Sequence, residues 1–168
     1  MRHVYVDIEA SGLSEDSYPI EIAWVCEETH ESDSFLINPS SIAQWHYWDE
    51  TAEQIHGIQR ELLLHEGIGV VEACERLNKA LVGAALVSDA LSFDGFWMSR
   101  LFVAASSTAQ FDMIGLDDLL TQDQLQRYKK VSRSQLRRHR ALPDVEAMMR
   151  AVTMVKRNEE GSSHWWFK

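Results

Sequence analysis

His3-Val4-Tyr5-Val6-Asp7-Ile8-Glu9, at the start of the chain, has the pattern of a β-strand. Over residues 3–8 apolar side chains alternate with others, which is the two-residue period of a half-buried strand. Asp7 and Glu9 therefore share one face of the strand. Ser11-Gly12 is expected to end it.

Three further strands are predicted after this first one. Strands are expected over 19–27 and 32–37, and the short turns before them favour an antiparallel meander. The short apolar run 84–88 predicts a buried strand. Together with the helices described next, these strands predict a single mixed α/β domain.

Helices are predicted from spacing and end signals. Thr51 to Gln54 resembles a capping box that Gly57 would close, and the face made by Val70, Cys74, Leu77 and Leu81 predicts a helix ending near Gly83. Ser92 is expected to cap a helix over 93–105. Leu142-Pro143-Asp144 opens the last helix, whose apolar face is Val145, Met148, Met149, Val152 and Val155.

The composition is that of one globular domain. Of 168 residues, 45% are hydrophobic and 25% charged, which excludes a disordered or fibrous chain. We expect a core over about 3–155 and a C-terminal tail over 156–168. No apolar run approaches the roughly 18 residues that span a bilayer, so no membrane partner and a cytoplasmic setting are expected. Cys26 and Cys74 suggest neither a disulfide framework nor a zinc site.

The net charge is −10, and the charged residues are spread unevenly along the chain. Residues 1–75 hold 16 acids and two basic residues, whereas residues 127–140 hold seven Lys or Arg and no acid. The acidic part can bind metal ions and the basic segment an anionic substrate. Alternatively, the basic segment is a solvated helix. Its cations are Arg127, Lys129, Lys130, Arg133, Arg137, Arg138 and Arg140.

Four acids and a histidine are the candidates for chemistry. Asp7 and Glu9 lie on an apolar strand, where acids are rarely tolerated unless they are paired or bind metal. Asp94 and Asp144 are expected in the first turns of two helices, and His139 comes five residues before Asp144. Solvated strand acids and helix-dipole acids are the plain alternatives. Carboxylate oxygens are the ligands that Mg²⁺ takes.

Three short segments stand in a suggestive order: Val6–Leu13 (VDIEASGL), Ser92–Trp97 (SFDGFW) and His139–Asp144 (HRALPD). Together they resemble the motifs of the DEDDh family, the DnaQ-like 3′→5′ exonucleases. Residues 50–58 resemble the His-Gly-Ile loop of many members. The resemblance covers residues 3 to about 155, and it implies a ribonuclease-H-like mixed sheet flanked by helices.

The resemblance also implies roles for matching residues. Asp7, Glu9 and Asp144 would ligate one metal ion, Asp7 would bridge to a second, and Asp94 would complete the site through a water. His139 would be the general base, and histidine suits proton abstraction near neutral pH. Two ions roughly 3.5–4 Å apart can generate the nucleophile and stabilise the leaving oxygen. The ions would be Mg²⁺, with Mn²⁺ as the alternative.

Substrate contacts are implied at further positions. The candidates are Ala10, Ser11, Leu13, His56, Phe93, Arg137 and Arg138. Leu13 and Phe93 are alternatively core residues, and His56 is alternatively a helix-end histidine. Asp89-Ala90 stands where members often carry His-Asn, which leaves the contacts of that loop open; Asp89 is alternatively a loop or capping residue.

From the resemblance we expect a 3′→5′ exonuclease that hydrolyses phosphodiester bonds at the 3′ ends of single-stranded RNA or DNA. One alternative is a nucleic-acid-binding module of the same fold that has lost turnover, and another is a ribonuclease-H-like endonuclease. Three adjacent aromatic residues, 165–167, stand near the end of the chain. They would stack on bases, or dock on the domain or on a second subunit of a homodimer.

Overall fold

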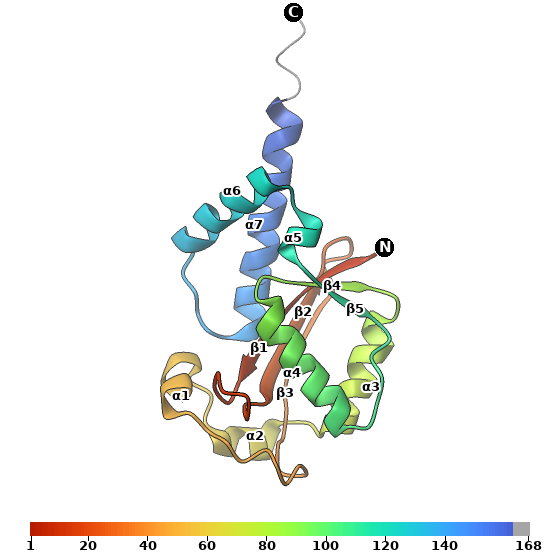
Figure 1. The fold of residues 1–168 in the computed structure, drawn as a ribbon, viewed down its shortest axis with the longest axis vertical. Coiled ribbons are helices and arrows are strands. Elements are labelled where there is room, and N and C mark those ends of the chain that lie inside the picture. Colours follow the sequence, from red (N-terminus) through yellow and green to blue (C-terminus); the bar gives the residue numbers. More distant parts are fainter. Residues whose placement is uncertain (163–168) are drawn as a thin grey trace, which may run out of the picture.

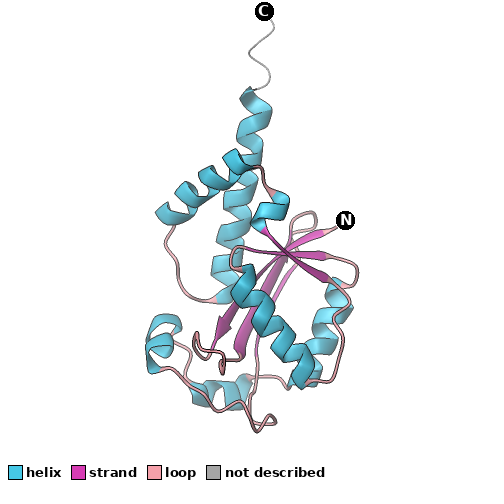
Figure 2. Cartoon of the chain, viewed as in Figure 1, coloured by secondary structure: helices cyan, strands magenta, loops and turns pink. Residues whose placement is uncertain are grey.

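A five-stranded mixed sheet lies at the centre of the structure, which is a computed structural model (Figures 1 and 2). The backbone is described for residues 1–162 and the side chains for residues 1–157. The strand order is β3-β2-β1-β4-β5. The strands are β1 (His3–Ala10), β2 (Pro19–Cys26), β3 (Ser32–Leu36), β4 (Ala85–Ser88) and β5 (Asp112–Gly115). β1, β2 and β3 pair antiparallel, as the predicted meander requires, and β4 and β5 continue parallel to β1.

Seven helices are described around this sheet. They are α1 (Glu50–His56), α2 (Arg60–Glu66), α3 (Val70–Leu81), α4 (Leu91–Ala104), α5 (Leu116–Leu119), α6 (Gln122–Ser134) and α7 (Ala141–Ser162). In Figure 1, α3 and α4 lie on one side of the strands, and α7 crosses them on the other. No helix within residues 1–162 is both long and apolar enough to cross a bilayer. Cys26 and Cys74 are buried and free.

The alternation of β1 divides the core in two. Val4, Val6 and Ile8 pack in one buried cluster with side chains of α3 and α4. Tyr5 belongs to the other cluster, with side chains of α6 and α7. Because Asp7 follows Tyr5 by two residues, Asp7 and Glu9 share this second face, on which α7 packs against β1 and β2. The position of the two acids thus follows from the strand period.

Two of the predicted helix starts were wrong. Asp49, rather than Thr51, caps α1, because its carboxylate accepts a hydrogen bond from the Thr51 amide at 2.8 Å. α4 begins at Leu91, before Ser92, and no side chain caps it. Gly57 closes α1 in the left-handed conformation, as predicted.

The segment 112–134 has no clear hydrophobic period in the sequence. It forms β5, α5 and α6. β5 and α5 have four residues each, too few for a hydrophobic period. α6 has one buried residue, Tyr128, so its apolar stripe is narrow. The signal for α6 was its capping box, in which Thr121 and Gln124 satisfy each other's backbone amides.

Candidate metal centre

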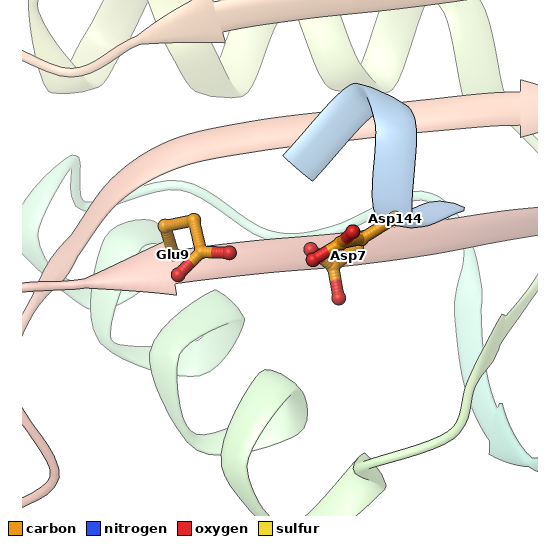
Figure 3. A group of neighbouring side chains, drawn as sticks. All are labelled: Asp7, Glu9 and Asp144. Atoms are coloured by element: carbon orange, nitrogen blue, oxygen red, sulfur yellow. The ribbon is translucent and has the colours of Figure 1, made fainter. Parts of the chain in front are cut away.

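Three carboxylates from the two ends of the chain meet on the face of β1 that α7 covers. Asp7, Glu9 and Asp144 each offer an oxygen atom, and these atoms all lie within 4.8 Å of one another. Figure 3 shows Asp7 and Glu9 projecting from β1 and Asp144 reaching toward Asp7 from the first turn of α7. The acids predicted from the first and third motif segments are therefore brought together.

The electrostatics of this group are unfavourable without a cation. Burial raises the pKa of Asp7 well above its usual range, and the neighbouring charges of Asp94 and Glu9 raise it further. Burial, followed by the charge of Asp144, raises the pKa of Glu9 to about 7. In addition, the buried Oδ2 atom of Asp7 has no hydrogen-bond partner. Buried polar atoms are normally satisfied, so this oxygen is free to ligate an ion.

Asp94 adjoins the group without belonging to it. Its side chain is 2% exposed, and its Oδ2 accepts a hydrogen bond from Ser88 Oγ at 2.5 Å. Burial raises the pKa of Asp94 to about 7, although the hydrogen bond from Ser88 opposes that shift. Asp94 exerts the largest single charge effect on Asp7. It thus contributes a fourth negative charge from the first turn of α4, beside the three clustered carboxylates.

The donor set fits a hard divalent cation. All the candidate ligand atoms are carboxylate oxygens, and the group includes neither cysteine nor histidine. Mg²⁺ and Mn²⁺ favour such oxygen ligands, and a bound cation would offset the mutual repulsion of the acids.

The loop between α6 and α7 carries the predicted base. His139 lies on this loop in the left-handed backbone conformation, with φ 52°. The loop is tied to the acids just before it reaches His139, because the Arg138 amide donates a hydrogen bond to Asp144 Oδ1 at 3.0 Å. His139 is therefore held next to a segment that contacts the acidic group, and its role as base stays a prediction.

Two arginines of the loop are held by carboxylates that lie far from them in the sequence. Arg137 donates to Asp89 Oδ2 at 2.9 Å, and Tyr128 Oη donates to the same oxygen at 3.0 Å. Arg140 forks onto Glu21 of β2 with distances of 2.9 and 3.0 Å. These pairs join residues 48 and 119 positions apart, so spacing in the sequence could not reveal them.

Arg137 also lies within the field of the acidic group. Burial lowers its pKa, but the charges of Asp89, Asp7 and Asp144 more than offset this effect, and the net shift is upward. Arg138 is exposed, as Arg137 is, but its described contact to the site is through its backbone. The two arginines predicted together therefore make different contacts.

Leu13 and Phe93 are exposed rather than packed in the core. Leu13 is 72% exposed on the loop after β1, and Phe93 is 44% exposed in the first turn of α4, where its ring meets Trp97. The loop bearing Leu13 is closely packed at Gly12, where a Cβ atom would lie 2.6 Å from the Tyr47 ring. The alternative reading of Leu13 and Phe93 as core residues was wrong. Their contact with substrate stays a prediction.

The other three predicted contacts are buried. Ala10 and His56 are 6% and 5% exposed, and Ser11 is fully buried with its hydroxyl oxygen accepting from the Tyr18 amide. The Nδ1 atom of His56 accepts from the Ile58 amide at 3.0 Å, and burial lowers the pKa of His56. These side chains therefore support the loops around the site in the conformation described. Direct substrate contact by them remains a prediction.

Comparison with solved structures identifies the fold. Exonuclease I of E. coli in complex with a dA16 oligonucleotide aligns with a TM-score of 0.76 and 16% identity, over 95% of this chain and 41% of that one. The zinc-bound form of the E. coli exonuclease I–ssDNA complex gives 0.74 and 16%, over 95% and 41%. Exonuclease I from Methylocaldum szegediense gives 0.70 and 14%, over 95% and 41%.

These similarities confirm the predicted architecture, a mixed sheet flanked by helices in a ribonuclease-H-like fold. The chain spans about two fifths of the length of the exonuclease I chains that it matches. No protein-family model and no curated protein sequence matches it.

Proposed function

We propose that the protein is a divalent-metal-dependent exonuclease that removes nucleotides from the 3′ ends of single-stranded DNA. The observation that carries this proposal is the group of Asp7, Glu9 and Asp144, whose oxygens lie within 4.8 Å of one another on a ribonuclease-H-like sheet. The motif order that resembles the DEDDh family supports it. So do structural neighbours that are exonucleases in complex with DNA oligonucleotides.

The proposed site holds two divalent ions, Mg²⁺ or Mn²⁺, on Asp7, Glu9 and Asp144, with Asp94 completing it. Such ions lower the pKa of bound water and stabilise the charge on the leaving oxygen. Asp7 would contact both ions, and its buried Oδ2 atom has no hydrogen-bond partner in the protein. The unsatisfied Oδ2 atom is the feature that supports this bridging role most directly.

The remaining residues position the strand and move a proton. His139 accepts a proton from the attacking water, and the loop that carries it is tied to Asp144. Arg137 and Arg138 orient the scissile phosphate, and Leu13 and Phe93 contact the terminal base. Their exposure leaves these two apolar side chains accessible to a ligand.

The decisive experiment follows both ends of one strand. Single-stranded DNA labelled at the 5′ end should yield a descending ladder in the presence of Mg²⁺, whereas a 3′ label should leave at once as a mononucleotide. A matched RNA strand should be cleaved more slowly. Internal fragments from both labels would indicate an endonuclease, and binding without products would indicate a module that has lost turnover.

Asp7→Asn is the matched control for that experiment. The amide has nearly the volume of the carboxylate but lacks its charge, so the variant should fold and bind metal poorly. Turnover should be almost abolished, and EDTA should have the same effect on the wild type reversibly. Activity like that of the wild type in Asp7→Asn at saturating Mg²⁺ would overturn the two-ion assignment.

A further inference from the structure

A cavity lies close to the acidic group. It has a volume of about 490 Å³, within the range of ligand-binding pockets. Its wall is formed by the end of β4, the junction of β5 with α5, and one face of α6. Ser88 belongs both to this wall and to the acidic site, because its hydroxyl donates to Asp94. Ser88 thus connects the wall of the cavity to Asp94.

Two cations of α6 line this cavity. Lys129 and Arg133 are one helical turn apart on the same side of the helix as Tyr128, so both reach the opening. Both are exposed, and neither forms an ion pair with any side chain described up to residue 157. Lys130, next to Lys129 and equally exposed, does not line the cavity.

The acids of the wall do not cancel these cations. Asp89 is neutralised by Arg137 and also accepts the Tyr128 hydroxyl. Asp117 is the other carboxylate of the wall, and its side chain folds against Gly115, where a Cβ atom would collide with it. Among the described side chains, two cations without an ion pair thus face one such acid in a cavity whose wall shares Ser88 with the acidic site, which favours an anionic ligand.

We propose that this cavity binds the phosphates of single-stranded DNA on the 5′ side of the scissile bond, through Lys129 and Arg133. The inference rests on the proposed function, because it takes the acidic group as the point of cleavage. The cations of the basic segment 127–140 then have different roles. Arg137 and Arg138 serve the scissile phosphate, Arg140 is committed to Glu21, and Lys129 and Arg133 hold the strand that follows.

The test measures affinity against strand length. Wild-type protein in EDTA, which blocks hydrolysis, is titrated with 5′-labelled oligothymidylates from dinucleotide to decanucleotide. Lys129→Ala/Arg133→Ala should lose most of the affinity gained with length, and its salt slope should be shallower by about 0.7 for each lost phosphate contact. Lys130→Ala is the matched control and should behave as the wild type.

The outcomes separate this inference from the proposed function. Equal length dependence and salt slope in the wild type and the double variant would overturn the cavity assignment, as would an equal loss in Lys130→Ala. If the wild type fails to release 3′-terminal nucleotides but the double variant still loses its length-dependent affinity, the exonuclease proposal fails and the binding cavity stands.

Discussion

Asp94 keeps a carboxylate almost wholly out of water beside three others, and this arrangement opposes stability in the absence of metal. Replacing it with asparagine retains an oxygen that can accept from Ser88 and removes the charge. Burial raises the pKa of Asp94 to about 7, and each pKa unit of such a shift corresponds to about 1.4 kcal/mol once the carboxylate is ionised. We therefore expect Asp94→Asn to raise the unfolding free energy of the metal-free protein at about pH 8 and to abolish most turnover.

Urea denaturation in EDTA measures that gain. The pKa of Asp94 is about 7 in the folded protein, so at about pH 5 the wild-type carboxyl is already protonated and the advantage of Asp94→Asn should shrink. Ser99→Ala, a change elsewhere on α4, is a suitable control. A variant less stable than the wild type at both pH values would show that the Asp94 charge is compensated.

His139 can be tested independently of the acids. If it removes the proton from the attacking water, His139→Ala should reduce kcat roughly 10²–10⁴-fold. Metal affinity should change little, because the group of clustered ligands does not include His139. Calorimetric titration with Mn²⁺ gives the second quantity. Loss of Mn²⁺ binding with turnover restored at high metal would instead make His139 a ligand.

At the scale of elements, Asp89 joins the end of β4 to both α6 and the loop before α7. One oxygen accepts from Tyr128 and from Arg137. Asp89→Ala leaves the buried Tyr128 hydroxyl without its acceptor, which costs about 1–3 kcal/mol, whereas Tyr128→Phe costs about 0.5–1.5 kcal/mol. The double variant should therefore be destabilised by less than the sum of the single changes, and urea denaturation of all four proteins measures the coupling.

Strict additivity would contradict this account of Asp89. A second readout concerns the loop. Asp89→Asn retains an acceptor for both donors and should restore most of the hydrogen-exchange protection that Asp89→Ala removes from residues 135–140.

The elements that could be predicted from the sequence are those whose apolar residues recur with a regular spacing. β1 could be predicted because its apolar side chains alternate, and α3 because its buried residues recur every three or four positions. β5 and α5 were too short for any period, and α6 buries too little apolar surface. Tertiary contacts determine such elements more than local preference does.

Some features of the candidate site could likewise be predicted from the sequence, and others could not. The four acids stand out because acids on apolar strands and at helix starts are chemically unusual in combination. The partners of the arginines could not be predicted, because Asp89 and Glu21 contact Arg137 and Arg140 only through the fold. The sequence also could not show which side chains of the site are exposed. Within one motif, Leu13 is exposed and Ser11 is buried.

For the whole molecule, the acidic group links stability to pH and to metal. The pKa values of Glu9 and Asp94 are about 7 in the folded protein, against values near 4 in an unfolded chain. The folded protein therefore holds more protons than the unfolded chain between these values. Its stability from these groups is full below about pH 4 and is lost as the pH rises through about 7.

Thermal denaturation in EDTA should consequently show a Tm that falls between about pH 5.5 and 8, by roughly 2–4 °C for each kcal/mol lost. Mg²⁺ should restore the Tm at about pH 8, because it binds the folded state alone. Asp7→Asn should respond weakly to Mg²⁺. A Tm in EDTA that rises over this range would mean that other groups govern the pH dependence.

The pairing of the first strand with the last described helix has a consequence for synthesis on the ribosome. Asp7 and Glu9 are made at the outset, but Asp144 and the fork of Arg140 on Glu21 join them only after more than a hundred further residues. Contacts of such high order close late in folding. A nascent chain therefore carries Asp7 and Glu9 without Asp144, and the three carboxylates come together only when α7 has been made.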